Sequence, residues 1–167
     1  MPDLLNGDQH ELDPLERQVL AVFVDGVRVL GLPRSIGEIY GLLFISPSAL
    51  ALDDLVLRLR ISKGSASQGL RMLKNLGAVR EANGSEDRRT YYEPAIELKR
   101  LVGGFIREQI RPHLDSGKTK IDLLAESARS LQDPVRRQFL SDRMERLDTW
   151  MTSSAKVLPF LQKLLGQ

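Results

Sequence analysis

The sequence predicts a mainly α-helical protein that contains one short β-hairpin. Of its 167 residues, 42% are hydrophobic and 28% are charged, a composition that argues against a disordered chain. Hydrophobic residues recur at steps of three and four along most of the chain, which is typical of amphipathic helices. Two short runs, Val79 to Ala82 and Thr90 to Glu93, are instead β-prone, and the polar segment between them begins with the turn signal Asn83-Gly84.

The first helix is expected over residues 14–30. Asp13-Pro14 followed by Glu16 supplies an N-cap, a proline at the first helical position and an acid at the third. Gly31 then stops the helix. Its hydrophobic residues form one stripe, so this helix is amphipathic.

The second and third helices are short. The second is expected from Ser35 to Ile45, because Glu38 stands three residues after Ser35 and completes a capping box. Asp53 and Asp54 are expected in the first turn of the third helix, which continues through Leu59, because negative charges suit the first turn of a helix.

The fourth helix is expected from Lys63 to about Leu76. Ser62 is its N-cap and Gly77 follows its end. An order of helix, helix, helix and hairpin is that of a winged helix-turn-helix. We therefore expect a winged helix-turn-helix domain with a two-stranded β wing over residues 33–93.

The chain after the hairpin is expected to form dimerisation helices. The stripe from Leu98 to Ile110 should end at Pro112, a second stripe covers residues 121–131, and Asp133-Pro134 begins a long last helix that bends at Pro159. The last stripe is wider than one small wing can cover, which predicts burial against a second copy of the chain, together with the first helix. We thus expect an N-terminal helix that supports dimerisation (residues 1–32) and a C-terminal dimerisation region (residues 94–167).

The face of the fourth helix opposite its core side carries small, amide and basic side chains and no acid. Such side chains suit base edges, with Arg for guanine and Gln or Asn for adenine, while Lys suits phosphate. An ordinary solvated helix face is the alternative. With two residues at the start of the second helix, the candidate DNA contacts are Arg34, Ser35, Ser62, Lys63, Gly64, Ser65, Ser67, Gln68, Arg71, Lys74 and Asn75.

The hairpin tip carries two arginines beside an acid. Arg88 and Arg89 are candidates to enter a minor groove, and Asp87 is a candidate brace for their guanidinium groups. A solvated turn with a weak surface ion pair is the alternative. The position of this tip after the fourth helix favours the DNA-binding interpretation.

At these residues the sequence resembles the GbsR-like branch of the MarR-type winged helix-turn-helix regulators. The resemblance covers about residues 30 to 95. One departure is Ala51, where Ser or Thr commonly caps the third helix; the expected loss is about 1 kcal/mol. The motifs are Pro33–Leu43, Ser62–Ser67, Leu70–Leu73, Leu76–Val79 and Asp87–Tyr92.

The resemblance implies a homodimeric DNA-binding transcriptional regulator, usually a repressor, from a bacterium or archaeon. It would read double-stranded DNA at a pseudo-palindromic operator, and better-studied relatives respond to choline or related osmolytes. An aromatic cage would suit such a cation. Tyr40 and Trp150 are the candidate effector contacts, because Phe23, Phe44, Phe105 and Phe139 fall on apolar stripes and are assigned to the core.

Other chemistry has little support in the sequence. The chain lacks cysteine, and His10 and His113 have no partner at zinc-ligand spacing. No catalytic grouping, membrane span or signal peptide is recognisable, so we expect a cytoplasmic, non-enzymatic protein without metal or cofactor. A winged-helix module that binds protein, without sequence-specific DNA binding, stays open as the alternative.

The net charge of +2 hides a strong local asymmetry. Residues 1–33 hold two basic and six acidic residues, whereas residues 61–92 hold six basic and three acidic ones, a net charge of +3. Residues 116–167 also carry a net charge of +3. A DNA phosphate meets the local charge, so the basic fourth helix and wing remain compatible with a polyanion partner.

Overall fold

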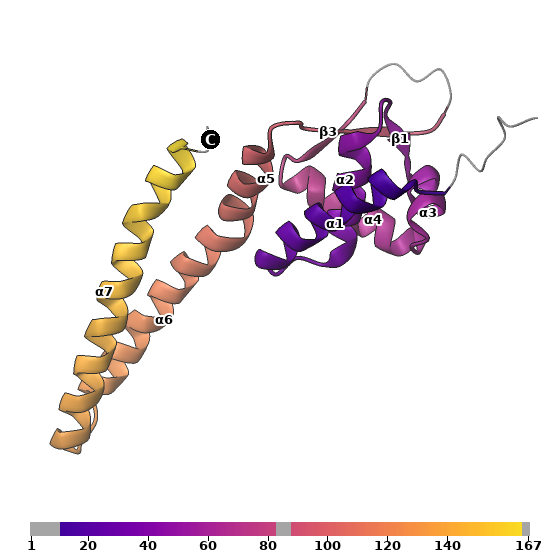
Figure 1. Cartoon of the computed structure of the whole chain (residues 1–167). Coiled ribbons are helices and arrows are strands. Elements are labelled where there is room, and N and C mark those ends of the chain that lie inside the picture. The colour runs from indigo at the N-terminus through magenta and orange to yellow at the C-terminus, as the bar shows by residue number, and fades with distance from the viewer. Residues whose placement is uncertain (1–10, 83–87, 165–167) are drawn as a thin grey trace, which may run out of the picture. The chain divides into compact units, whose positions relative to one another are not determined.

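The computed structural model describes residues 11–82 and 88–164, and it divides into two compact units. The first unit is Met1–Leu101 and the second is Val102–Gln167. The first contains α1 (Pro14–Val29), α2 (Arg34–Ile45), β1 (Leu50–Ala51), α3 (Leu52–Leu59), α4 (Lys63–Asn75), β2 (Val79–Glu81) and β3 (Tyr91–Pro94) (Figure 1). Then follow α5 (Leu98–Phe105), which spans the boundary, the π-helix η1 (Ile106–Ile110), α6 (Arg111–Arg129) and α7 (Pro134–Leu164).

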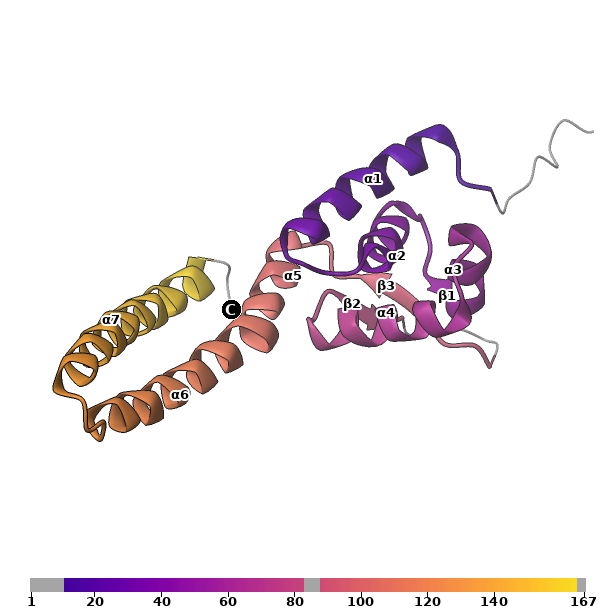
Figure 2. The same cartoon turned by 90° about the horizontal axis from the view of Figure 1, so that it is seen from below.

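Helix α2 lies at the centre of the first unit, between α1 and α4 (Figure 2). Five of its side chains are almost completely buried, and burial of large apolar side chains is the main source of folding free energy. A Cβ on Gly37 would lie 2.7 Å from the backbone of Val24, so α1 and α2 approach each other very closely there. The buried side chains are Ile36, Ile39, Tyr40, Leu42 and Leu43.

The wing is part of a three-stranded antiparallel sheet with strand order β1-β3-β2. The expected β2–β3 pair is confirmed, with Glu81 opposite Tyr92. The expectation of only two strands was incomplete, because Leu50 of β1 pairs with Tyr92 from the other side. A strand of two residues is too short to show an alternating pattern. Together these elements form a mainly helical winged-helix fold, as the sequence predicted.

Three of the four predicted helix starts in the first unit are confirmed and one is wrong. Asp53 and Asp54 lie in the first turn of α3, as expected. The backbone N–H of Glu16 donates to Asp13, and that of Ser65 donates to Ser62 Oγ. The capping box at Ser35 does not form, because α2 begins at Arg34 and its N-cap residue is Pro33, two residues before the predicted cap. Glu38 instead accepts a hydrogen bond from Arg34 Nε at 2.7 Å.

The second unit is built around the pair of α6 and α7, which pack side by side (Figures 1 and 2). The predicted N-cap of α7 is confirmed, since Asp133 Oδ1 accepts from the backbone N–H of Val135 at 2.9 Å. The predicted helix end at Pro112 is wrong. The helical path continues from η1 into α6, and Arg111 N–H bonds Ile106 oxygen in the wider π pattern just before the proline. Within the described residues, no helix is long and apolar enough to cross a bilayer.

Candidate nucleic-acid interface

Helix α4 presents the predicted polar face to solvent. Its buried side is formed by Ala66, Gly69, Leu70 and Leu73. The Ser62 hydroxyl caps the start of the helix, with a distance of 3.0 Å to the Ser65 nitrogen. The predicted contact residues exposed along the rest of the helix are Lys63, Gly64, Gln68, Arg71, Lys74 and Asn75.

Gln68 and Arg71 have polar groups that are available to a ligand. Neither side chain forms a hydrogen bond or an ion pair with any residue in the described part of the chain. A guanidinium has five donors and an amide has both a donor and an acceptor, which is what bidentate recognition of a base edge requires. These two residues are therefore the strongest reading candidates on α4.

A shallow hollow of about 270 Å³ brings several candidates together beside the sheet. Ser67, Arg71, Lys74 and Asn75 of α4 line it, together with Tyr92 of β3. The fold thus places the second half of α4 next to the base of the wing. Basic and polar groups from two elements converge at this surface.

The two lysines of α4 are paired with carboxylates. Lys63 Nζ lies 3.2 Å from Asp53 Oδ1 of α3, and Lys74 forms an ion pair with Glu81 of β2. The hydrogen bond from Lys74 to Glu81 raises the pKa of that lysine, so it stays cationic. Both pairs are exposed and therefore weak, so a phosphate can compete for either lysine.

At the base of the wing, Arg89 is held by residues that the sequence did not assign to it. Its guanidinium lies 5.1 Å from the centre of the Tyr91 ring and donates to the Tyr91 hydroxyl. It also lies 3.9 Å from Asp54 Oδ1, while Asp54 Oδ2 accepts from the Ala51 N–H at 2.9 Å. Arg88 is exposed, and the candidate brace Asp87 lies outside the described residues.

Asp54 and Tyr91 could not be assigned to Arg89 from local sequence. Asp54 lies far from Arg89 along the chain, and the sequence indicated only that its charge suits a helix start. In the structure Asp54 also bonds the backbone N–H of Ala51, the N-cap residue of α3, whose methyl side chain cannot accept a capping hydrogen bond. One carboxylate therefore joins the start of α3 to the wing.

The remaining predicted residues lie elsewhere. Arg34, at the start of α2, lines a groove shared with α1 and α3, and Ser35 is half-buried beside it. Tyr40 is fully buried and its hydroxyl donates to the Ala95 carbonyl at 2.6 Å, so no effector reaches the ring in this conformation. Trp150 is exposed on α7 in the second unit. Among the described residues, no group of His, Asp and Glu side chains is arranged to hold a metal ion.

Comparison with known proteins supports the fold. No protein-family model matches the chain, and no curated protein matches it in sequence. A solved crystal structure of a transcriptional regulator matches with a TM-score of 0.62 and 21% sequence identity, over 92% of this chain and 97% of that one. The chain has the fold of that regulator. At this identity the similarity establishes the fold, and function has to be argued from the surface of α4 and the wing.

Proposed function

We propose that this protein is a sequence-specific DNA-binding transcriptional regulator of the GbsR-like branch of the MarR-type family. It acts in the cytoplasm of a prokaryote as a homodimeric repressor. The observation that carries the proposal is the acid-free face of α4, on which Gln68 and Arg71 are exposed and make no bond to a described residue. Similarity to a transcriptional regulator in fold supports it.

The roles of the residues follow from their positions. Helix α4 enters the major groove, where Arg71 reads guanine and Gln68 reads adenine. Lys63 and Lys74 exchange their carboxylate partners for phosphates. Arg88 and Arg89 reach the adjacent minor groove from the wing.

A dimer would let two α4 helices read the halves of a pseudo-palindromic operator about 34 Å apart, one turn of DNA. Helix α1 supports dimerisation because it has a second apolar stripe that the first unit does not cover. Leu15, Val22 and Val29 on this stripe are exposed. A small-molecule effector would switch affinity only if it bound two dimer arrangements unequally.

The decisive experiment measures binding to the DNA upstream of the protein's own gene, mapped first by footprinting. The Gln68→Ala/Arg71→Ala protein should lose most of its preference for the mapped site over unrelated DNA. The Arg71→Ala change alone should cost about 1–3 kcal/mol on that site. A matched control removes the same side-chain types from the start of α7, as Arg136→Ala/Gln138→Ala, where both residues are exposed. Wild-type affinity and preference in the α4 variant would refute this reading face.

The alternative is a winged-helix module that binds protein. The salt dependence of DNA binding distinguishes it from the proposed function. Binding through several phosphates releases counterions, so affinity for DNA should fall steeply between 50 and 200 mM salt. Affinity that is unchanged over this range would favour the protein-binding alternative.

A further inference from the structure

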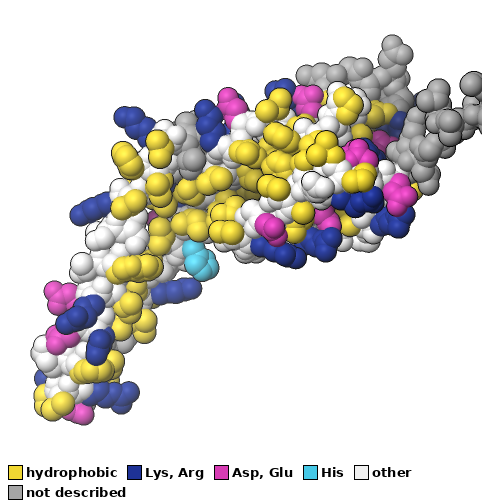
Figure 3. Space-filling model, viewed as in Figure 1, with side chains coloured by type: hydrophobic (Ala, Val, Ile, Leu, Met, Phe, Trp, Pro, Cys, Tyr) yellow, Lys and Arg dark blue, Asp and Glu magenta, His cyan; other side chains and the backbone are white. Residues whose placement is uncertain are grey.

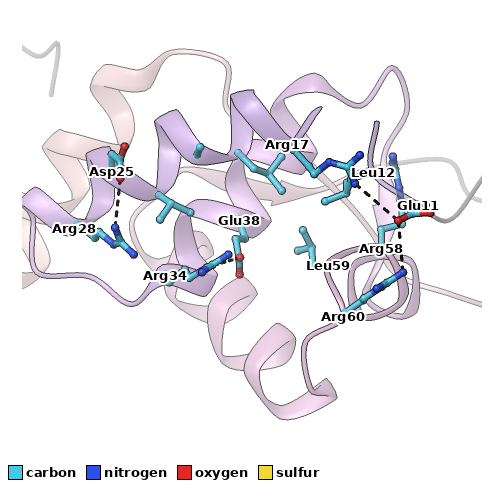
Figure 4. Close-up of a pocket in the computed structure, with 13 residues that line it drawn as sticks. Glu11, Leu12, Arg17, Asp25, Arg28, Arg34, Glu38, Arg58, Leu59 and Arg60 are labelled. Atoms are coloured by element: carbon cyan, nitrogen blue, oxygen red, sulfur yellow. Dashed lines mark hydrogen bonds and ion pairs between the residues drawn. The ribbon is translucent and has the colours of Figure 1, made fainter. Parts of the chain in front are cut away.

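A second concave site of the first unit lies away from the reading face of α4. It is a groove of about 480 Å³ between α1, α2 and α3, a volume in the usual range of small-molecule sites. Figure 4 shows arginine and acidic side chains around its rim. Its floor is apolar and is formed by Leu20, Ala21 and Val24 of α1 with Leu59 of α3.

The two ends of the groove differ in charge. At one end, Arg28 pairs with Asp25 at 3.5 Å and Arg34 pairs with Glu38 at 2.7 Å, so the charges balance. The other end is shared by three arginines and two carboxylates, which leaves one positive charge in excess. These five residues are Arg17, Arg58, Arg60, Glu11 and Glu16.

Arg58 has an unmet hydrogen-bond donor at the positive end. Its Nη2 donates to Glu16 Oε1 at 2.6 Å, in a pair whose side chains are only 17% and 18% exposed. Its Nε is buried and has no hydrogen-bond partner among the described residues. A buried donor on a charged group is costly to leave unpaired, so an acceptor that reached this end would be stabilised.

Arg60 adopts a backbone conformation that glycine normally supplies. It is the C-cap residue of α3 with φ of 54°, in the left-handed region, where a side chain is unfavourable and glycine is the usual choice. Its side chain is 81% exposed and points toward Glu11, with 3.8 Å between the nearest atoms. The same Glu11 oxygen lies 3.9 Å from Arg17. A carboxylate of the chain itself thus marks a position between two guanidinium groups.

We propose that this groove binds a medium-chain monocarboxylate. The carboxylate lies at the positive end, among Arg17, Arg58 and Arg60, and the alkyl chain extends over Leu20, Ala21 and Val24 toward the balanced end. One excess positive charge fits a monoanion better than a dianion. The proposal does not depend on DNA binding, because all these residues belong to the first unit and none lies on the reading face of α4.

The test is titration calorimetry with octanoate, hexanoate and octan-1-ol at matched concentrations. Octanoate should bind with 1:1 stoichiometry. It should bind more tightly than hexanoate, by about two- to fourfold for each of its two additional methylenes, because these bury apolar area on the floor of the groove. Octan-1-ol has the same chain without the charge and should bind at least tenfold more weakly. Equal binding of octanoate and octan-1-ol, or no binding of octanoate, would overturn the proposal.

Two variants separate ligand binding from folding. Arg60→Gly removes a guanidinium at a backbone position that suits glycine, so it should fold at least as stably as wild type and yet bind octanoate at least about fivefold more weakly. Glu11→Gln removes the internal carboxylate and should bind octanoate more tightly. Arg129→Ala, at the end of α6 in the second unit, makes the same charge change as Arg60→Gly and should bind like wild type. Wild-type affinity in Arg60→Gly, or weaker binding in Glu11→Gln, would refute the assigned carboxylate position.

Discussion

At the scale of single residues, Tyr40 shows how a polar group is accommodated in the core of the first unit. Its side chain is 0% exposed and its hydroxyl donates to the Ala95 carbonyl at 2.6 Å. The ring centre lies 5.2 Å from that of Phe23 in an edge-to-face pair, a favourable arrangement of aromatic rings. Burial raises the pKa of the Tyr40 hydroxyl above its ordinary value of 10.0.

The raised pKa of Tyr40 predicts a loss of stability in alkali. Above about pH 10 the unfolded chain releases this proton while the folded protein retains it, so the free energy of unfolding falls as pH rises. Tyr40→Phe should lose about 1 kcal/mol at pH 7, the value of one hydrogen bond, and part of the alkaline slope. Urea unfolding followed by circular dichroism from pH 7 to 11 measures both.

The comparison of the two proteins isolates Tyr40 from other groups. Lys74 and Lys118 also have pKa values raised by hydrogen bonds to carboxylates, and they titrate in the same alkaline range in both proteins. The difference between the wild-type and Tyr40→Phe curves therefore reports on the buried hydroxyl. Parallel curves up to pH 11 would contradict the assignment.

At the scale of elements, the packing of α1 against α2 depends on Gly37. A Cβ there would meet the Val24 Cα and nitrogen at 2.7 Å and the Phe23 oxygen at 2.8 Å. These are backbone atoms, which cannot rotate away as a flexible side chain can. Only the absence of a side chain allows the two helices to approach this closely.

We expect Gly37→Ala to destabilise the first unit by about 1–3 kcal/mol, the usual cost of overpacking a core. Gly26→Ala is the matched control, since Gly26 lies inside α1 and an added Cβ would have no described atom of another element within 4 Å. It should stabilise the protein by about 0.5–1 kcal/mol, because alanine favours a helix interior more than glycine does. Thermal and urea unfolding measure the change in stability for each variant, which should be a decrease for Gly37→Ala and an increase for Gly26→Ala. Equal effects of the two changes would show that the close approach is not what matters.

The elements predicted correctly are those whose signals are local. The Asp13–Glu16 capping box and the Ser62 cap lie within four residues of the bonds they make. The β2–β3 hairpin was indicated by composition. Strand β1 was missed because two residues carry no pattern and their pairing partners lie about 40 residues away in the chain. The continuation of the helix through Pro112 was missed because a π turn has no simple sequence signal.

The candidate sites divide in the same way. The exposed face of α4 follows from helical periodicity alone, so Gln68 and Arg71 could be placed on it in advance. The contacts of Arg89 with Asp54 depend on how α3 meets the wing, and periodicity carries no information about that. The groove is assembled from three helices, and its arginines come from separate stretches of the chain: Arg17 and Arg28 from α1, Arg34 from α2, and Arg58 with Arg60 from the end of α3.

At the scale of the whole molecule, large apolar side chains are exposed in each unit. In the first unit, Leu15, Val22 and Val29 lie at helical spacing on the side of α1 that its buried residues do not occupy. In the second unit, the exposed apolar side chains of α7 include Trp150, Val157 and Leu164, at steps of seven residues. Figure 3 shows hydrophobic side chains at the surface along the α6–α7 pair. Large contiguous apolar patches are rare on the surface of soluble monomers and usually mark interaction surfaces.

The exposed stripe of α7 predicts that the chain is a homodimer in solution and that a charge on the stripe separates the subunits. Val157 is 53% exposed, so Val157→Glu should not disturb the fold of one subunit but should bury a charge in a dimer interface, which is strongly unfavourable. Sedimentation equilibrium should give a dimer for wild type and a monomer for the variant at micromolar concentration.

Trp150 supplies an independent readout of the same prediction, because it is the only tryptophan in the chain and it is 63% exposed. Its emission should lie at shorter wavelength in the dimer than in Val157→Glu, since association removes water from the indole. Thr152→Glu adds the same charge at an exposed position of α7 outside the stripe and should leave both mass and emission unchanged. If Val157→Glu also sediments as a dimer with wild-type emission, the subunits associate through another surface. The apolar stripe of α1 is then the next surface to test, with Val22→Glu.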